Sequence, residues 1–69
     1  MEINDNTDGR IRKNIRSGLS VAIVLKEDQS TGILTDGIVR DILTKSLKHP
    51  HGIKVCLMSG EVGRAKEIY

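Results

Sequence analysis

The sequence predicts a mainly β protein that folds as one small antiparallel β-barrel. Four runs rich in β-branched residues are separated by turn-forming residues, which is typical of short strands. The connections between these runs are too short for a crossover helix, which excludes parallel βαβ units. Only 38% of the 69 residues are hydrophobic, enough for one small core but not for a second domain. Antiparallel strands of this size commonly protect their edges by closing into a barrel.

A tail precedes the predicted domain. Residues 1–9 are polar and acidic and show no hydrophobic periodicity, so we expect a disordered, flexible tail there and a single domain over residues 10–69. Residues 10–16 are basic, and one helical turn would place Ile11 and Ile15 on the same side. An extended lead-in fits this segment equally well, because it is too short to form a stable helix alone.

The first strand is expected over residues 20–26, which form the strongest β-branched run of the chain. Alternation along this strand places three apolar side chains on one face: Val21, Ile23 and Leu25. Residues 27–32 contain two acidic residues followed by Gln, Ser, Thr and Gly. They are predicted to form a solvated loop that ends in a turn.

Residues 33–44 admit two interpretations. Their apolar residues include a stripe with helical spacing, for which Asp36 would serve as the N-cap. In that helix Gly37 would fall in the first turn, and the segment is rich in β-branched residues. We therefore favour a strand that bends, with a β-bulge accounting for the irregular alternation of its apolar residues.

The last two strands are predicted to form a hairpin. After a polar loop over residues 45–51, apolar side chains alternate at positions 53, 55 and 57, which indicates a strand whose Lys54 points to solvent. Ser59 and Gly60 then indicate a tight turn, and residues 61–68 return as the final strand.

Positive charge is distributed unevenly along the chain. The net charge is +2, but three acidic residues, Glu2, Asp5 and Asp8, precede every basic residue. Residues 9–69 therefore carry eleven basic and six acidic residues, a net charge of +5. This balance suits binding to phosphate backbones or acidic proteins, and equally a solvated surface with no partner. The sole aromatic residue is Tyr69, which excludes modules that stack bases on aromatic platforms.

Cysteine usage and the apolar runs indicate the compartment. Cys56 is the sole cysteine, whereas a secreted domain of this length commonly carries several disulfides. No basic start followed by an apolar run is visible, so we expect no signal peptide. The longest uninterrupted apolar run, residues 21–25, is far shorter than the roughly 20 residues that span a bilayer. We therefore expect a cytoplasmic protein without membrane contact.

Three segments together resemble a known family. They are Lys-x-Asp-Gln-x-Thr-Gly at residues 26–32, His-Pro-His-Gly-Ile-Lys-Val at residues 49–55 and Gly-Glu-Val-Gly-Arg at residues 60–64. The first two are the most specific motif segments. With them, residues 12–68 resemble the YwbE-like family of small, uncharacterised bacterial and archaeal proteins. The resemblance implies a stand-alone β module and no established activity. Ala65 stands where a larger aliphatic residue is expected.

A short pattern, Gly-x-Val-x-x-apolar, begins at Gly37 and again at Gly60. It resembles the strand pattern of SH3-like and KOW barrels found on ribosomal and transcription proteins. The resemblance implies an SH3/KOW-like barrel. It concerns the fold and carries little weight for function.

Candidate catalytic and metal-binding residues are sparse. His49 and His51 flank Pro50, and two imidazoles at this spacing can share a metal only if a third ligand arrives from elsewhere. Because the spacing places no such ligand, we expect neither a metal site nor a cofactor. The alternative is a rigid loop, in which Pro50 fixes the backbone and Gly52 permits a sharp entry into the strand. Cys56 is expected to be a small strand side chain, and no catalytic residues are assigned, so we do not expect an enzyme.

Basic residues are the better candidates for binding. If the strands pair in order, Arg40, Lys54 and Arg64 would form a stripe on the outside of the sheet. The candidate nucleic-acid-binding residues are Arg40, Lys45, Lys48, His49, His51, Lys54 and Arg64. The sequence thus favours a module that binds nucleic acid, RNA rather than DNA, and the alternative is a protein–protein interaction module.

Overall fold

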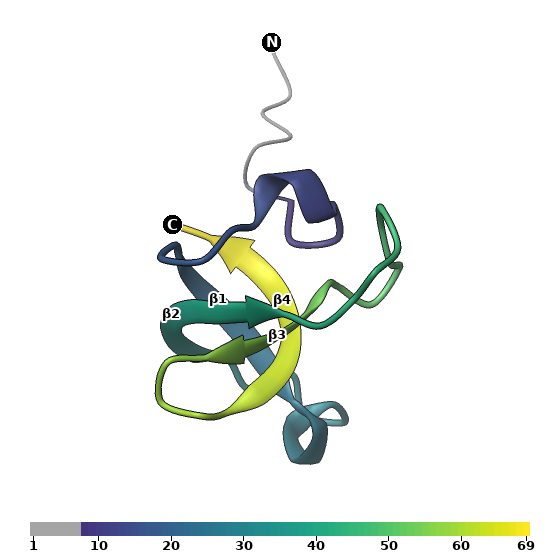
Figure 1. Ribbon diagram of the computed structural model, residues 1–69. Helices are drawn as coiled ribbons and strands as arrows, with labels where there is room; N and C mark the ends of the chain where they lie inside the picture. The colour runs from purple at the N-terminus through teal and green to yellow at the C-terminus, as the bar shows by residue number, and fades with distance from the viewer. Residues whose placement is uncertain (1–7) are drawn as a thin grey trace, which may run out of the picture.

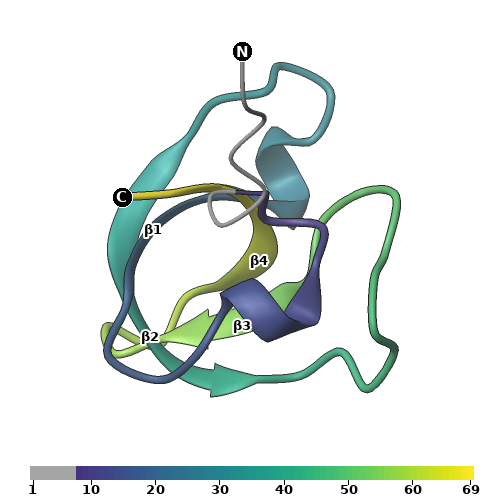
Figure 2. The same ribbon diagram turned by 90° about the horizontal axis from the view of Figure 1, so that it is seen from above.

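Four antiparallel strands close into a barrel in the computed structural model, which describes residues 8–69. The strands are β1 (Ser20–Leu25), β2 (Thr35–Ile42), β3 (Lys54–Leu57) and β4 (Val62–Ile68). Consecutive strands pair with each other, and β1 also pairs with β4, which closes the barrel (Figure 1). Figure 2 shows the strands curving around the interior. The predicted fold class, a mainly β protein with a small antiparallel barrel, is confirmed.

The core is made by side chains that alternate along the strands, as the sequence pattern predicts. Its members are Ile15, Val21, Ile23, Val39, Ile53, Val55, Leu57, Ala65 and Ile68. Six large aliphatic side chains of this set are fully buried, and each contributes about 1.5–3 kcal/mol relative to an exposed position. The same alternation leaves Lys54 exposed between buried neighbours, as expected for the outer face of β3.

The ambiguous segment forms strand β2, so the favoured prediction is confirmed and the helix is not formed. Gly37 pairs with β1, and a Cβ atom there would lie 2.5 Å from Leu57 Cδ1. The pairing of β2 with β3 shifts between Val39 and Asp41, where a bulge bends the strand. The bulge explains why the apolar residues of this segment do not alternate cleanly.

Within residues 8–69, two short 3₁₀ helices lie on either side of β1 in the sequence. The basic lead-in contains η2 (Arg12–Asn14), so it forms one helical turn rather than fully extended chain. The loop predicted after the first strand begins with η3 (Lys26–Asp28), which ends β1 one residue earlier than predicted. No helix within residues 8–69 is long and apolar enough to cross a membrane.

The segment that leads into η2, with the first residue of η2, runs beside the long loop between β2 and β3. The Arg12 amide donates to the Leu47 carbonyl at 2.8 Å, and the His49 amide donates to the Arg10 carbonyl at 2.9 Å. These two hydrogen bonds tie the histidine loop, residues 43–53, to the lead-in. The loop is therefore held in place by backbone contacts from a segment far away in the sequence.

Two residues of the predicted tail belong to the barrel. Gly9 is buried and accepts a hydrogen bond from the Ile53 amide at 2.9 Å. Asp8 forms an isolated antiparallel bridge with Glu67. The disorder predicted for the rest of the tail concerns residues 1–7, which lie outside the described residues.

Candidate functional site

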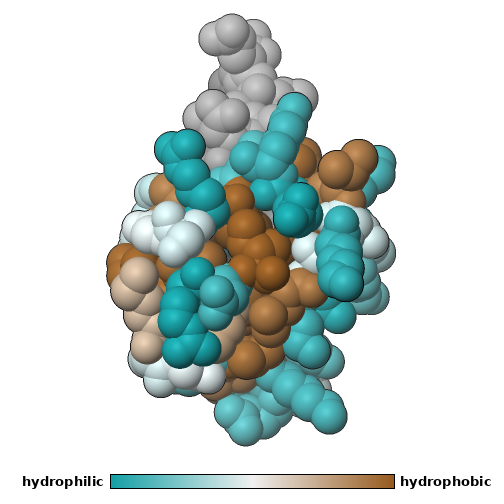
Figure 3. All heavy atoms as spheres, in the orientation of Figure 1, coloured by the Kyte–Doolittle hydropathy of each residue, from teal (hydrophilic) through white to brown (hydrophobic). Residues whose placement is uncertain are grey.

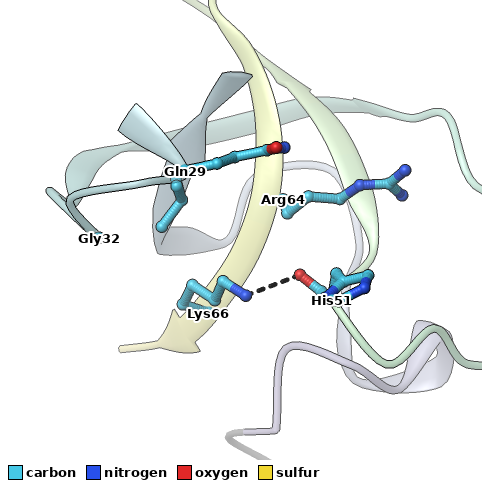
Figure 4. Close-up of a pocket in the computed structure, with 6 residues that line it drawn as sticks. Gln29, Gly32, His51, Arg64 and Lys66 are labelled. Carbon is cyan, nitrogen blue, oxygen red and sulfur yellow. Dashed lines mark hydrogen bonds between the residues drawn. The ribbon is translucent and has the colours of Figure 1, made fainter. Parts of the chain in front are cut away.

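A groove runs across the outer face of β4. It consists of two adjoining hollows of about 570 and 390 Å³, which share Gln29 and Arg64 in their linings. We call this surface the basic groove and define it by its polar side chains: Lys26, Gln29, His51, Lys54, Arg64 and Lys66. Figure 4 shows the end of the groove between Gln29 and His51.

The floor of the groove is formed by basic side chains on the outer face of β4, and strand pairing fixes their neighbours. The inner face of β4 carries small buried residues, so Arg64 and Lys66 on its outer face point away from the core. Arg64 lies opposite Lys54 of β3 on one side and Val24 of β1 on the other. A Cβ atom at Gly63 would lie 2.5 Å from the Val24 carbonyl oxygen, so glycine permits the close contact of β1 and β4 beneath the groove.

The loop that follows β1 forms one wall of the groove. The Asp28 carbonyl accepts hydrogen bonds from the amides of Thr31 and Gly32, at 3.1 and 2.8 Å, so this turn satisfies its own backbone. Gly32 has a positive φ of 74°, which suits glycine at the end of the turn. The Gln29 side chain extends across β4 toward Arg64 (Figure 4). Within residues 8–69 the side-chain amide of Gln29 forms no hydrogen bond, so its donors and its acceptor are available to a ligand.

The histidine loop forms the opposite wall. Lys66 Nζ donates to the His51 carbonyl at 2.8 Å (Figure 4), and Arg64 Nη1 approaches the Gly52 carbonyl at 3.4 Å. Gly52 has a φ of 102°, and a Cβ atom at this position would overlap the carbonyl oxygen of Ala65. The loop can therefore lie against β4 because residue 52 is glycine, which confirms the expected role of Gly52 in a sharp turn.

The two histidines interact within the loop. Their ring centroids are 5.7 Å apart, and the His51 amide donates to His49 Nδ1 at 3.1 Å. Partial burial lowers the pKa of His49 below its usual value, and the positive charge of Arg64 and the neighbouring His51 lower it further. The lowered pKa favours the neutral imidazole, whose Nδ1 accepts the hydrogen bond from the His51 amide within the loop.

The cations of the groove are not neutralised by neighbouring acids. No carboxylate is among the side chains that line either hollow. The ion pairs within residues 8–69 are Arg10–Asp8 and Arg40–Asp41, both outside the groove. The positive field of the groove is consequently directed at solvent, and an anionic ligand would meet no acidic side chain there.

The structure brings together some of the predicted site residues. His51, Lys54 and Arg64 line the groove, and His49 lies close enough to Arg64 for the two to interact electrostatically. Lys45 is exposed in the histidine loop and lines neither hollow of the groove. Lys48 lines a separate hollow beside Arg10 and Asp8.

The predicted stripe of three basic residues is corrected at Arg40. Lys54 and Arg64 are paired, but the bulge in β2 brings Arg40 beside Cys56, one outward position further along β3 than Lys54. There Arg40 Nη2 lies 3.1 Å from Cys56 Sγ, and its Nε lies 3.0 Å from an Asp41 carboxylate oxygen. Arg40 is therefore already paired and does not belong to the groove.

Three groove residues were absent from the predicted site: Lys26, Gln29 and Lys66. Charge alone did not distinguish Lys26 and Lys66 from the other basic residues. A usable signal was present in the two most specific motif segments, because Lys26 and Gln29 belong to the first, and His51 and Lys54 to the second. The barrel brings these two segments to opposite sides of one groove.

Other candidate chemistry is limited in the described part of the chain. No cluster of three or more His, Cys, Asp or Glu side chains among residues 8–69 is arranged to hold a metal ion. Cys56 is a buried side chain of β3, as predicted.

Comparison with known proteins identifies the family. The family model described as "Uncharacterized conserved protein (DUF2196)" matches residues 8–68. The chain belongs to this family. The match covers every residue of the basic groove, including both motif segments.

One relative within this family comes from Bacillus subtilis (strain 168) and is described as "Uncharacterized protein YwbE". It is 59% identical over 61 residues, which cover 88% of this chain and 94% of the relative. The resemblance to the YwbE-like family drawn from the sequence motifs is thereby confirmed. No solved structure matches the chain.

Proposed function

We propose that the protein is a small nucleic-acid-binding module that holds an RNA backbone in its basic groove. The observation that carries the proposal is the convergence of Lys26, Lys54, Arg64 and Lys66 on one groove whose lining contains no carboxylate. Cationic side chains near phosphates release condensed counterions, and this release supplies most of the affinity of non-specific nucleic-acid binding.

The groove also offers hydrogen bonding suited to a nucleic-acid backbone. Arg64 presents a planar guanidinium, which can form two parallel hydrogen bonds to phosphate oxygens. The Gln29 amide is both donor and acceptor and so matches a ribose 2′-hydroxyl, which supports RNA over DNA. The resemblance of the strand pattern to barrels of ribosomal and transcription proteins supports the same choice at the level of the fold.

In this function the protein is a binding module rather than an enzyme. It needs no cofactor and acts in the cytoplasm. Its chemistry requires only positioned donors and positive charge. The lone thiol of Cys56 is compatible with a reducing compartment. Because the chain has no aromatic platform, we expect micromolar affinity and little preference among base sequences.

The test measures binding of a fluorescently labelled, structured RNA mixture by anisotropy at low salt. We expect the parent to bind, and we expect Lys54→Ala and Arg64→Ala to weaken binding to all RNAs to a similar extent. Lys13→Ala removes the same charge from η2, outside the groove, and is the matched control for Lys54→Ala. It should retain most of the affinity.

Two results would overturn the proposal. One is no RNA or DNA binding at low salt, and the other is parental affinity in a Lys54→Ala, Arg64→Ala double variant. Either result would make the groove a solvated surface and would leave the protein–protein interaction module as the remaining function.

A further inference from the structure

An apolar surface lies directly beside the basic groove. We call it the apolar shelf and define it by three exposed residues, Ile38, Met58 and Val62, whose exposed fractions are 38%, 57% and 38%. Figure 3 shows that hydrophobic and hydrophilic side chains both reach the surface on the face where β2 and β3 lie toward the viewer.

The strand register brings the three shelf residues close to one another. Val62 of β4 pairs with Cys56 of β3, and Met58 is the next outward position after Cys56. The Met58 amide donates to the Ile38 carbonyl of β2 at 2.8 Å, which places these two residues side by side. The shelf therefore extends from β2 over the start of the turn after β3 to β4, and the Arg40 side chain lies beside it over Cys56.

The shelf and the groove meet at Val62. This residue lines the second hollow of the groove together with Lys26, Lys54 and Arg64. Isolated apolar residues on a surface are ordinary, but these three lie near one another and next to cations without acidic partners, so the surface has an anion-binding side and an apolar side.

That combination matches a single nucleic-acid strand. A single strand carries phosphates along one side and exposes the apolar faces of its bases on the other. A duplex buries its base faces in the stack and presents phosphates on its outside, so it has nothing to place on the shelf. Aliphatic side chains can pack against a base face by burying apolar area, without an aromatic ring.

We infer that the groove and the shelf together bind single-stranded RNA in preference to duplex RNA, with phosphates in the groove and bases on the shelf. The inference rests on the proposed function and specifies its ligand. It assigns Val62 and Met58 as base-packing residues and leaves the electrostatic contribution to the groove cations.

The test compares a labelled single-stranded oligouridine with a hairpin duplex of the same number of nucleotides by anisotropy over a range of salt. We expect the parent to prefer the single strand. A Met58→Ser, Val62→Thr double variant should lose about three- to tenfold in affinity for the single strand, because apolar contact area is removed. Its affinity for the duplex should fall by less than its affinity for the single strand, and its salt slope should not change because no charge is removed.

Folding controls accompany the double variant. Met58→Ser alone changes the more exposed side chain, just outside β3, and should show part of the same loss with an unchanged thermal melt. Met58→Leu keeps an apolar side chain of similar size and should bind like the parent.

The outcomes separate the inference from the proposed function. Equal affinity for both RNAs, or an equal loss for both in the double variant, overturns the inference while salt-dependent binding keeps the proposed function. No salt-dependent binding of either RNA removes the proposed function itself. Concentration-dependent dimerisation that the double variant abolishes would assign the shelf to a second copy of this chain and overturn the inference.

Discussion

Single glycines decide whether the walls of the groove can form. The sequence predicts a sharp turn at Gly52, but it does not show that this residue lies against the backbone of β4. That contact depends on tertiary packing, because the carbonyl oxygen of Ala65 occupies the place where a Cβ atom would be. Gly60 is the useful comparison, since it also has a positive φ but has open space around it.

We therefore predict different effects for two glycine-to-alanine substitutions. Gly60→Ala should lower the free energy of unfolding by about 1 kcal/mol, the usual penalty for a left-handed alanine. Gly52→Ala should lower it by at least about 3 kcal/mol, because backbone atoms of β4 would have to move. Urea denaturation of both variants measures the difference. Equal losses would contradict the close contact of the histidine loop with β4.

A second residue-scale prediction concerns His49 and pH. Its pKa is lowered in the folded state by partial burial, by Arg64 and by His51, so the unfolded chain binds a proton more readily. Stability from this residue is present above the ordinary histidine pKa of about 6.5 and is lost as the pH falls through the lower folded value. Thermal melts should thus show a decrease in Tm on acidification below about pH 6.5. That decrease should be smaller in His49→Gln, and an identical decrease would contradict the account.

At the scale of elements, local sequence predicts where the strands lie but not which side chains of different strands become neighbours. Alternating apolar residues identified β3, the tight turn at Ser59 and Gly60 indicated the return strand β4, and β-branched content correctly favoured a strand for residues 33–44. The place of Arg40 depended on a register shift between Val39 and Asp41: the irregular hydrophobic pattern indicates a bulge in this segment but does not fix which β3 residue lies beside Arg40. The groove itself depends on pairing of β1 with β4, a contact between distant segments, so Lys26 and Lys66 could not be grouped from the sequence.

Thr44 gives a testable link between β2, β3 and the groove. Its Oγ1 accepts a hydrogen bond from the Lys54 amide at 2.7 Å and lies 3.5 Å from Arg64 Nη1. Thr44→Val keeps the shape of the side chain but removes the acceptor, and it should lower the free energy of unfolding by about 1 kcal/mol. Thr31→Val is the control, because its hydroxyl donates to the Asp28 carbonyl, which also accepts two amides. A loss no larger than the control would show that Thr44 does not anchor the start of β3.

At the scale of the whole molecule, charge is separated along the chain. All eleven basic residues follow Gly9, and the acidic start adds negative charge to a protein whose groove is cationic. Composition therefore predicted the sign of the field, but it could not locate the field on one face. The fold does so by placing the two most specific motif segments on opposite walls of one groove.

This separation predicts the effect of a truncation. Deleting residues 1–7 removes Glu2 and Asp5 but keeps Asp8 and Gly9, which belong to the barrel, and it raises the net charge to +4. RNA affinity at low salt should rise modestly, and the difference should disappear at high salt because charges are then screened. A truncated protein that binds more weakly than the parent would show that the acidic segment does not oppose binding.

The salt dependence of RNA binding by Arg64→Ala tests the central claim most directly. The slope of log K against log salt should be about −0.7 for each phosphate neutralised on a single strand, so four groove cations predict a slope near −3. Arg64→Ala should reduce its magnitude by about 0.7, whereas Arg40→Ala should change it less, because Asp41 already pairs with Arg40. Identical slopes for the parent and Arg64→Ala, or a larger change in Arg40→Ala, would contradict a phosphate-binding groove on β4.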